Sequence, residues 1–159
     1  MTLSRKIAAA LDTIAPDAVT SWAEAREGRH ALSLHVTANG PVGLAFDALS
    51  FATEDAPELS AEALRAWADR LAARVTYLME PLVVVELDPV AGVAELRSNA
   101  PTARGDLKSY YEIRLHNSGA LGLSRVVFDE SSRRRHSADC QLTREVLERL
   151  ADDLVACAC

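Results

Sequence analysis

The sequence has no long hydrophobic run. Its longest apolar stretches are short, as in residues 81–87 (PLVVVEL), and none approaches the roughly 20 residues that a membrane-spanning helix needs. The N-terminal segment carries Arg5 and Lys6 before an apolar-looking stretch, as an export signal would. Asp12 and Pro16 interrupt that stretch and its apolar residues keep helical spacing, so we expect a surface helix there. These features predict a cytoplasmic protein without a membrane partner.

Cysteine is scarce. The chain contains only Cys140, Cys157 and Cys159, and an odd count without an export signal favours a reducing compartment over a disulfide scaffold. Cys157 and Cys159 lie in a terminal CAC that we interpret as the frayed end of an apolar helix. Cys140 stands near His136, but a Cys–His nucleophile needs an orienting third group, and the sequence displays none.

Basic side chains are outnumbered by acidic ones. The 17 Lys and Arg residues face 23 Asp and Glu residues, which gives a net charge of -6 and a pI near 5.2. This balance repels a phosphate backbone, so we expect no nucleic-acid partner. The one basic cluster is residues 131–137 (SSRRRHS). It suits a phosphate, a carboxylate or an acidic peptide, although such charge runs usually face water.

Recognised catalytic and cofactor motifs are also missing from the sequence. It has no GxxxxGK[ST] phosphate-binding loop, no glycine-rich nucleotide motif and no nucleophile elbow. His35 and His116 fall on corresponding predicted strands, but neither has a carboxylate or a cysteine at ligand spacing. Metal sites usually display three or four ligands. We therefore predict no catalytic residue, no metal and no cofactor.

The chain does contain the pattern of a single α+β domain covering residues 1–159. Three segments have helical periodicity: residues 3–15, a stretch capped by Ser60 that ends at Pro81, and a C-terminal stretch capped by Thr143. The runs between them alternate apolar and polar residues, as hairpins do. Three helices are too few to cover both faces of a parallel sheet. We therefore predict a two-layer sandwich, with the helices over one face of an antiparallel sheet of hairpins.

Turn residues place the hairpins. Residues 39–40 (Asn-Gly) are the strongest short hairpin signal, because they suit a two-residue turn with positive φ at both positions. Further turns are expected at residues 88–92 and 117–119. We expect loops at residues 99–108 and 129–140, where no alternation is visible.

The second and third helices resemble each other. Residues 59–71 (LSAEALRAWADRL) align with residues 142–154 (LTREVLERLADDL) with six identities, and the hairpins before them correspond at a slightly smaller shift. A fixed period is typical of a repeated supersecondary unit, so the pattern predicts an internal duplication with units at about 29–79 and 108–157. Two amphipathic helices with similar caps also look alike without duplication, and the sequence leaves that alternative open.

Several strings resemble those of a family of uncharacterised bacterial proteins: residues 74–82 (RVTYLMEPL), 96–98 (LRS), 109–115 (SYYEIRL) and 142–154. The resemblance covers about the last hundred residues and implies no activity. A looser resemblance is to type III secretion chaperones, which are small, acidic, cytosolic and usually dimeric. The order of helices and strands is similar, and this resemblance implies a chaperone-like dimer. The hairpin at residues 109–128 departs from that order and leaves the dimer surface open.

These observations favour a non-enzymatic protein-binding domain, chaperone-like or adaptor-like, whose partner is another protein or a second copy of the chain in a homodimer. An exposed sheet edge is able to accept an extended partner. The alternative is a small-ligand-binding protein or enzyme with a groove between the two repeat units, whose candidate groups are His35, His116, Arg114 and Arg125. The residues that we predict to form the binding surface are Trp22, His35, Tyr110, Arg114, His116, Arg133, Arg134 and Arg135.

Overall fold

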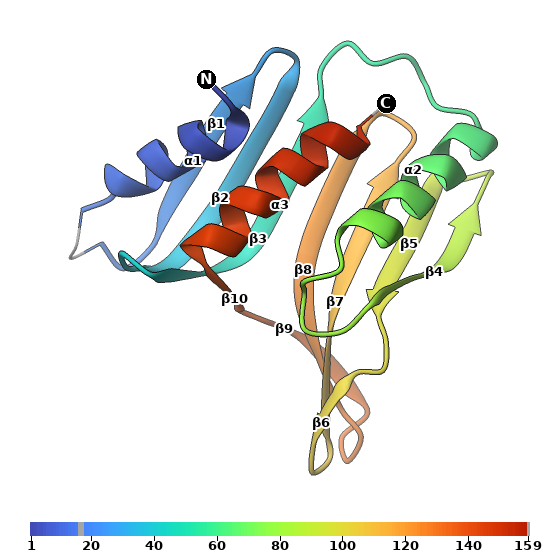
Figure 1. Ribbon diagram of the computed structural model, residues 1–159. Helices are drawn as coiled ribbons and strands as arrows, with labels where there is room; N and C mark the ends of the chain where they lie inside the picture. The colour runs from blue at the N-terminus through green and yellow to red at the C-terminus, as the bar shows by residue number, and fades with distance from the viewer. Residues whose placement is uncertain (16–17, 159) are drawn as a thin grey trace.

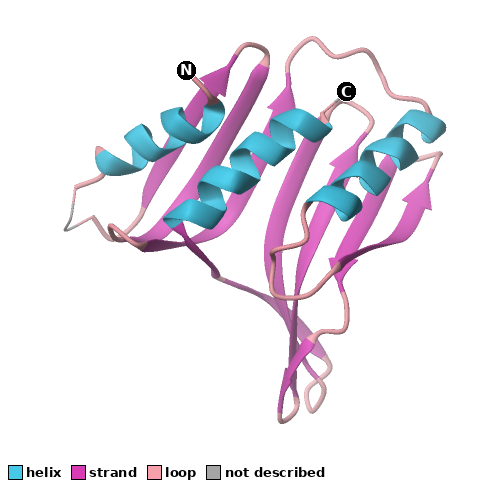
Figure 2. Ribbon diagram, in the orientation of Figure 1, coloured by secondary structure: helices cyan, strands magenta, loops and turns pink. Residues whose placement is uncertain are grey.

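The structure is a computed structural model that describes residues 1–15 and 18–158. Within them, three helices and one ten-stranded antiparallel sheet form two layers (Figures 1 and 2). The predicted α+β sandwich is therefore confirmed. The elements are α1 (Leu3–Asp12), β1 (Ser21–Glu27), β2 (His30–Asn39), β3 (Gly43–Thr53), α2 (Ala61–Arg74), β4 (Leu82–Asp88), β5 (Val93–Ser98), β6 (Thr102–Arg104), β7 (Leu107–His116), β8 (Ala120–Asp129), β9 (Arg134–Ala138), β10 (Cys140–Thr143) and α3 (Arg144–Cys157).

The sheet has the strand order β1-β2-β3-β8-β7-β5-β4. Three short strands lie off this path, because β6 pairs with β7, β9 with β8 and β10 with β3. Every pairing is antiparallel, as short hairpin connections require. The strands β1 and β4 therefore form the two ends of the sheet, and β3 and β8 join its halves.

The helices all lie on one face of the sheet (Figure 2). α1 packs on β1, α2 packs on β4 and β5, and α3 lies between the other two helices. The core forms where their apolar stripes meet the inward rows of the strands, and its largest fully buried side chains are Trp67, Tyr111, Phe46 and Phe51. Among the described residues, no helix has the length and apolar character needed to cross a membrane.

Each helix begins at a side-chain cap. The hydroxyl of Ser60 accepts a hydrogen bond from the backbone N–H of Ala63, and the hydroxyl of Thr143 accepts one from Val146, both at 3.1 Å. Thr2 caps α1 in the same way. These bonds satisfy amide groups that have no partner within the helix. The two caps predicted from the sequence, Ser60 and Thr143, are thus confirmed.

Several boundaries differ from the sequence-based predictions. The first helix ends at Asp12 rather than at residue 15, and Pro16, the predicted terminator, lies outside the described residues. The second helix ends at Arg74, well before Pro81, because Val75 leaves the helical conformation. The β2–β3 hairpin turns over residues 40–42 rather than through a two-residue Asn-Gly turn, because Pro41 fixes its own φ and restricts the residue before it.

Two segments expected to be loops contain strands. β6 lies within residues 99–108, and β9 lies within residues 129–140. β9 is exposed along most of its length, so it has no alternation of apolar and polar residues to detect, and it forms through its backbone pairing with β8. The C-terminus also differs. Cys157 belongs to α3 and is buried rather than frayed, whereas Cys159 lies outside the described residues.

The predicted duplication stays a prediction. The hairpins β2–β3 and β7–β8 do lie side by side in the middle of the sheet. The helix that follows each hairpin is placed differently, because α2 covers β4 and β5 while α3 lies between α1 and α2. The chain from residue 1 to residue 158 shares one continuous sheet and one core in its described parts.

A buried carboxylate joins the second and third helices. Asp153 of α3 accepts hydrogen bonds from the Arg74 guanidinium at 2.7 Å and from the Tyr77 hydroxyl at 2.6 Å. The Arg149 guanidinium lies over the Tyr77 ring, 4.2 Å from its centroid. Burial and the neighbouring carboxylate raise the pKa of Tyr77, so the phenol stays protonated and continues to donate.

Replacing this carboxylate is expected to destabilise the fold. We predict that Asp153→Ala lowers the free energy of unfolding by about 2–3 kcal/mol, because it leaves a half-buried phenol and a guanidinium without their acceptor. The matched control is Asp69→Ala, whose exposed partner is Arg65 on the same helix and whose loss should cost at most about 0.5 kcal/mol. Urea denaturation followed by circular dichroism measures both. Equal effects would contradict the role of Asp153.

Candidate functional site

The face of the sheet opposite the helices is uncovered (Figure 2). The strand register places Ser33, Ser50 and Gly122 in one row across β2, β3 and β8. The same row continues through Arg114 of β7 to Glu95 of β5. This row therefore has small side chains in its middle and charged side chains over β7 and β5.

The charged cluster on this face consists of Glu95, Arg97, Glu112, Arg114 and Arg135. Glu95 receives hydrogen bonds from Arg97 and Arg114, both at 3.2 Å. Glu112 receives one from Arg135 at 2.6 Å, and Arg114 lies 3.7 Å from it. The register sets Glu95 opposite Arg114 and Arg97 opposite Glu112, and such opposite charges on facing positions stabilise a strand pair.

The two carboxylates of the cluster are both buried and have opposite pKa shifts. Hydrogen bonding with Glu112, together with Arg114 and Arg97, lowers the pKa of Glu95. Burial raises the pKa of Glu112, and its proximity to Glu95 raises it further. The pair is thus arranged so that Glu95 holds the negative charge while Glu112 takes up a proton more easily than an ordinary glutamate.

The aromatic residue Trp22 lies at the other end of this face. Its side chain is 59% exposed, and its ring centroid is 4.9 Å from that of His35. His35 is bonded in turn to Asp47, with 2.6 Å between Nδ1 and the carboxylate oxygen. The chain Trp22–His35–Asp47 therefore orients the imidazole, and the indole extends from the edge strand β1.

The predicted binding residues fall into separate groups. Tyr110, Arg114 and Arg135 gather over β7 and β9, where the Arg97 guanidinium also lies over the Tyr110 ring at 5.4 Å from its centroid. Trp22 and His35 form the second group on β1 and β2. His116 is exposed at the end of β7, Arg133 lies in the β8–β9 turn with φ 56°, and Arg134 begins β9. Their role in binding stays a prediction.

The two histidines considered for a shared metal do not meet. His35 lies on β2 and His116 on β7, with β3 and β8 between them. In the part of the chain that the structure describes, no three His, Cys, Asp or Glu side chains are grouped to hold a metal ion. Cys140 is buried, and its burial raises the pKa of the thiol to about 12, so this thiol is protonated at neutral pH.

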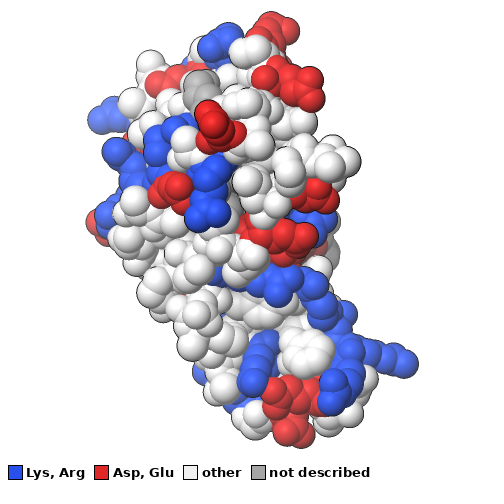
Figure 3. All heavy atoms as spheres, turned by 90° about the vertical axis from the view of Figure 1, so that its right-hand side faces the viewer, with Lys and Arg blue, Asp and Glu red and all other residues white. Residues whose placement is uncertain are grey.

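The end strand β4 carries exposed apolar side chains. It pairs with β5 and with no other strand among the described residues. Val83 is 42% exposed and Val85 is 49% exposed, and Met79 precedes them at 69%. A register shift between Val84 and Glu86 leaves Val85 without a partner residue on β5. Figure 3 looks onto this side of the molecule and shows uncharged surface between groups of acidic and basic side chains.

A buried arginine lies on the covered face, past the end of the helices. The guanidinium of Arg125 stacks on the Tyr111 ring at 4.5 Å and donates a hydrogen bond to Ser109 at 3.0 Å. Glu80 approaches it at 3.7 Å while accepting bonds from Ser98 and Thr102. Of the residues considered for a ligand groove, only Arg125 lines the cavity found here, because His35, Arg114 and His116 belong to the uncovered face.

Comparisons with models of known protein families, with curated proteins and with solved structures found no match for this chain. The functional argument therefore rests on the geometry of the sheet, its end strands and its cavity.

Sequence reasoning named Arg114 and Arg135 but missed the other members of the charged cluster and the valines of β4. Along β5, Glu95 and Arg97 alternate with the buried apolar residues Ala94 and Leu96. This alternation indicates a polar outward face for the strand, so it was a usable signal. The pairing of Glu95 with Arg114 needs the register between β5 and β7, and no local pattern specifies a register between strands joined through β6.

Opposite effects are expected from neutralising the two carboxylates. We predict that Glu95→Gln lowers the free energy of unfolding at pH 7 by about 1–3 kcal/mol, because two charge-assisted hydrogen bonds weaken. Glu112→Gln should leave it within about 0.5 kcal/mol of the parent or raise it, because Gln resembles the protonated form that burial favours.

The pH dependence separates these effects from a general loss of packing. The raised pKa of Glu112 contributes stability that is present below the pKa of an unfolded glutamate and is lost as the pH rises through the folded value. The lowered pKa of Glu95 does the reverse, so its contribution is lost as the pH falls. Urea titrations between about pH 3 and 8 measure the free energy of unfolding against pH. Glu112→Gln should lose the fall in stability with rising pH, and Glu95→Gln should lose the fall with decreasing pH. A Glu112→Gln variant less stable than Glu95→Gln at pH 7 would show the assignment to be wrong.

The thiol of Cys140 should resist alkylation in the folded protein. We predict that iodoacetamide at about pH 8 leaves Cys140 unmodified while the fold is intact, because it is buried and its raised pKa leaves almost no thiolate. Peptide-resolved mass spectrometry measures the modified fraction, and the same reaction in urea provides the control. Rapid labelling of the folded protein would contradict the burial and restore this thiol as a candidate nucleophile.

Proposed function

We propose that the protein is a non-enzymatic protein-binding domain, chaperone-like or adaptor-like, that accepts an extended segment of a partner along β4. The supporting observation is that β4 is an end strand with exposed Val83 and Val85 and with one side unpaired among the described residues. Unpaired backbone groups on an edge strand are able to add a further strand, and neighbouring side-chain contacts then give specificity.

The opposite end of the sheet is less suited to this role. The outward side chains of β1 include Glu24 and Arg26, and Arg26 is already paired with Glu54. Charged side chains are a common protection of sheet edges. β4 has no basic residue between Leu82 and Asp88, so the protection is weaker there.

The chemistry of β4 indicates the kind of segment it would accept. Apolar side chains are expected opposite Val83 and Val85, and a lysine or arginine is expected opposite Glu86, which is exposed and has no ion pair among the described residues. The bulge at Val85 bends the strand. A bent edge opposes unselective edge-to-edge association, which favours a specific partner over a second copy of the chain.

A photo-crosslinking series tests the proposal in living cells. A benzophenone amino acid at Val83 is expected to form one dominant covalent adduct with another polypeptide. The same group at Glu24, which is exposed on β1, is the matched control and is expected to form none. Mass spectrometry of the adduct identifies the partner and the crosslinked segment.

Each outcome of this series bears on the proposal. An adduct at position 83 that contains an extended segment of a different protein supports it. An adduct of the chain with itself would replace the partner with a homodimer. Adducts at position 24 alone, or at neither position, would exclude β4 as the binding edge.

A further inference from the structure

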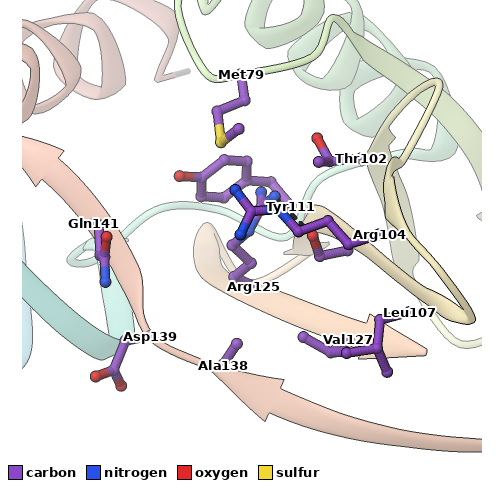
Figure 4. A pocket seen from close by; sticks show the side chains of 11 residues that line it. Met79, Thr102, Arg104, Leu107, Tyr111, Arg125, Val127, Ala138, Asp139 and Gln141 are labelled. Carbon is purple, nitrogen blue, oxygen red and sulfur yellow. Dashed lines mark hydrogen bonds between the residues drawn. The ribbon is translucent and has the colours of Figure 1, made fainter. Parts of the chain in front are cut away.

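One candidate for a ligand site is a cavity of about 400 Å³ at the end of the helical layer. It lies on the same face of the sheet as the helices, where β7 and β8 extend past them, between the segment that precedes β4 and the strands β6 to β10 (Figures 1 and 4). Its volume is within the range of small-molecule sites. The lining residues are Met79, Thr102, Arg104, Leu107, Ser109, Tyr111, Arg125, Val127, Ala138, Asp139 and Gln141.

Arg125 lines this cavity with a largely buried guanidinium. Its side chain is only 10% exposed, and its Nη1 atom is buried without a hydrogen-bond partner. Glu80 lies 3.7 Å from that atom, which is too long for a hydrogen bond. Among the described residues, Nη1 is therefore paired only with Glu80, and what Arg125 offers a ligand in the cavity is its positive charge.

A second arginine lines the same cavity. Figure 4 shows the Arg104 side chain extending from β6 toward Arg125 and the Tyr111 ring. Arg104 has no ion pair within the described residues, although most other arginines of the chain do. Two guanidinium groups that line one cavity give it a positive charge that favours an anion.

The remaining groups limit the charge and shape of that anion. Glu80 lies beneath Arg125 and offsets part of its charge, and Asp139 is a further acidic residue of the lining. These two carboxylates oppose a dianion. Leu107, Val127 and Met79 give the cavity an apolar wall. The lining thus combines one anion-binding end with space for a hydrocarbon body.

We propose that this cavity binds a small monocarboxylate with an apolar body, held by the positive charges of Arg125 and Arg104, which both line it. Ser109 and the Tyr111 ring hold the Arg125 guanidinium in place for this contact. The site does not depend on the β4 edge, so its test and that of the protein-binding proposal are independent.

Octanoate is a suitable probe because it has one carboxylate and an apolar chain. We expect isothermal titration to give a dissociation constant of about 1 mM or lower, with NMR shifts at Met79, Ser109 and Tyr111. Octan-1-ol and octylamine, which share the chain but lack the carboxylate, should bind at least about tenfold more weakly. Inorganic phosphate should also bind more weakly, because it has no apolar body to fill the cavity.

Arg104→Gln is the decisive variant, because Arg104 is exposed and has no ion pair that the fold needs within the described residues. It should weaken octanoate binding about tenfold. Arg29→Gln, in the exposed β1–β2 turn, is the matched control and should leave binding unchanged. Arg125→Lys keeps the buried charge but loses the stacked fork, and should weaken binding as well.

Three results would overturn the proposal. The first is the absence of NMR shifts with octanoate at about 10 mM. The second is binding of octan-1-ol or phosphate as tight as that of octanoate, since the cavity would then recognise only the hydrocarbon or only the charge. The third is equal weakening by Arg104→Gln and Arg29→Gln, which would indicate a general electrostatic effect.

Discussion

The sheet must keep its inner face out of water, and three helices shield only part of the length of its strands. Beneath the helices, one row of apolar side chains runs across the whole sheet. Burial of that row against the helices is the main source of stability, as apolar burial is in most domains. Its members are Ala23, Leu34, Leu49, Leu123, Ile113, Leu96 and Val84.

The composition of the inner face changes where the helices end. Polar groups enter the inner face toward that end of the strands. One row there places Arg125 between Tyr111 and Ala138. Ser98 and Glu80 complete a buried polar network around them. A polar network at the margin of a core is acceptable only when its members are satisfied, and the exception here is Nη1 of Arg125, which is paired with Glu80 without a hydrogen bond. The cavity is thus a direct consequence of strands that extend beyond their cover.

The same arrangement determines which parts of the sheet are accessible to partners. α1 and α2 pack on the inner face of the end strands, so neither helix extends around an edge. β1 presents Glu24 and Arg26 beside Trp22, whereas β4 presents Val83 and Val85 beside Glu86. The side of the molecule with β4 is therefore the one where backbone pairing and apolar contact are available together, which is the combination that strand addition uses.

Much of this architecture was predictable from the sequence because it follows local rules. Short sequence patterns predict the helix caps at Ser60 and Thr143, the alternation in β2, β5 and β7, and the burial of Tyr111. β9 was not predictable, because its residues are exposed and it forms only through pairing with β8. The charged cluster required a strand register, and the cavity required knowledge of where the helices end over the sheet.

Residue-resolved amide hydrogen exchange of the isolated protein tests the central claim, a free edge on β4, most directly. The account predicts that alternate amides of β4, those that do not bond to β5, exchange rapidly, while amides of β3 and β8 in the middle of the sheet exchange slowly. Slow exchange at every amide of β4 would contradict it, because the edge would then already be paired in the protein alone.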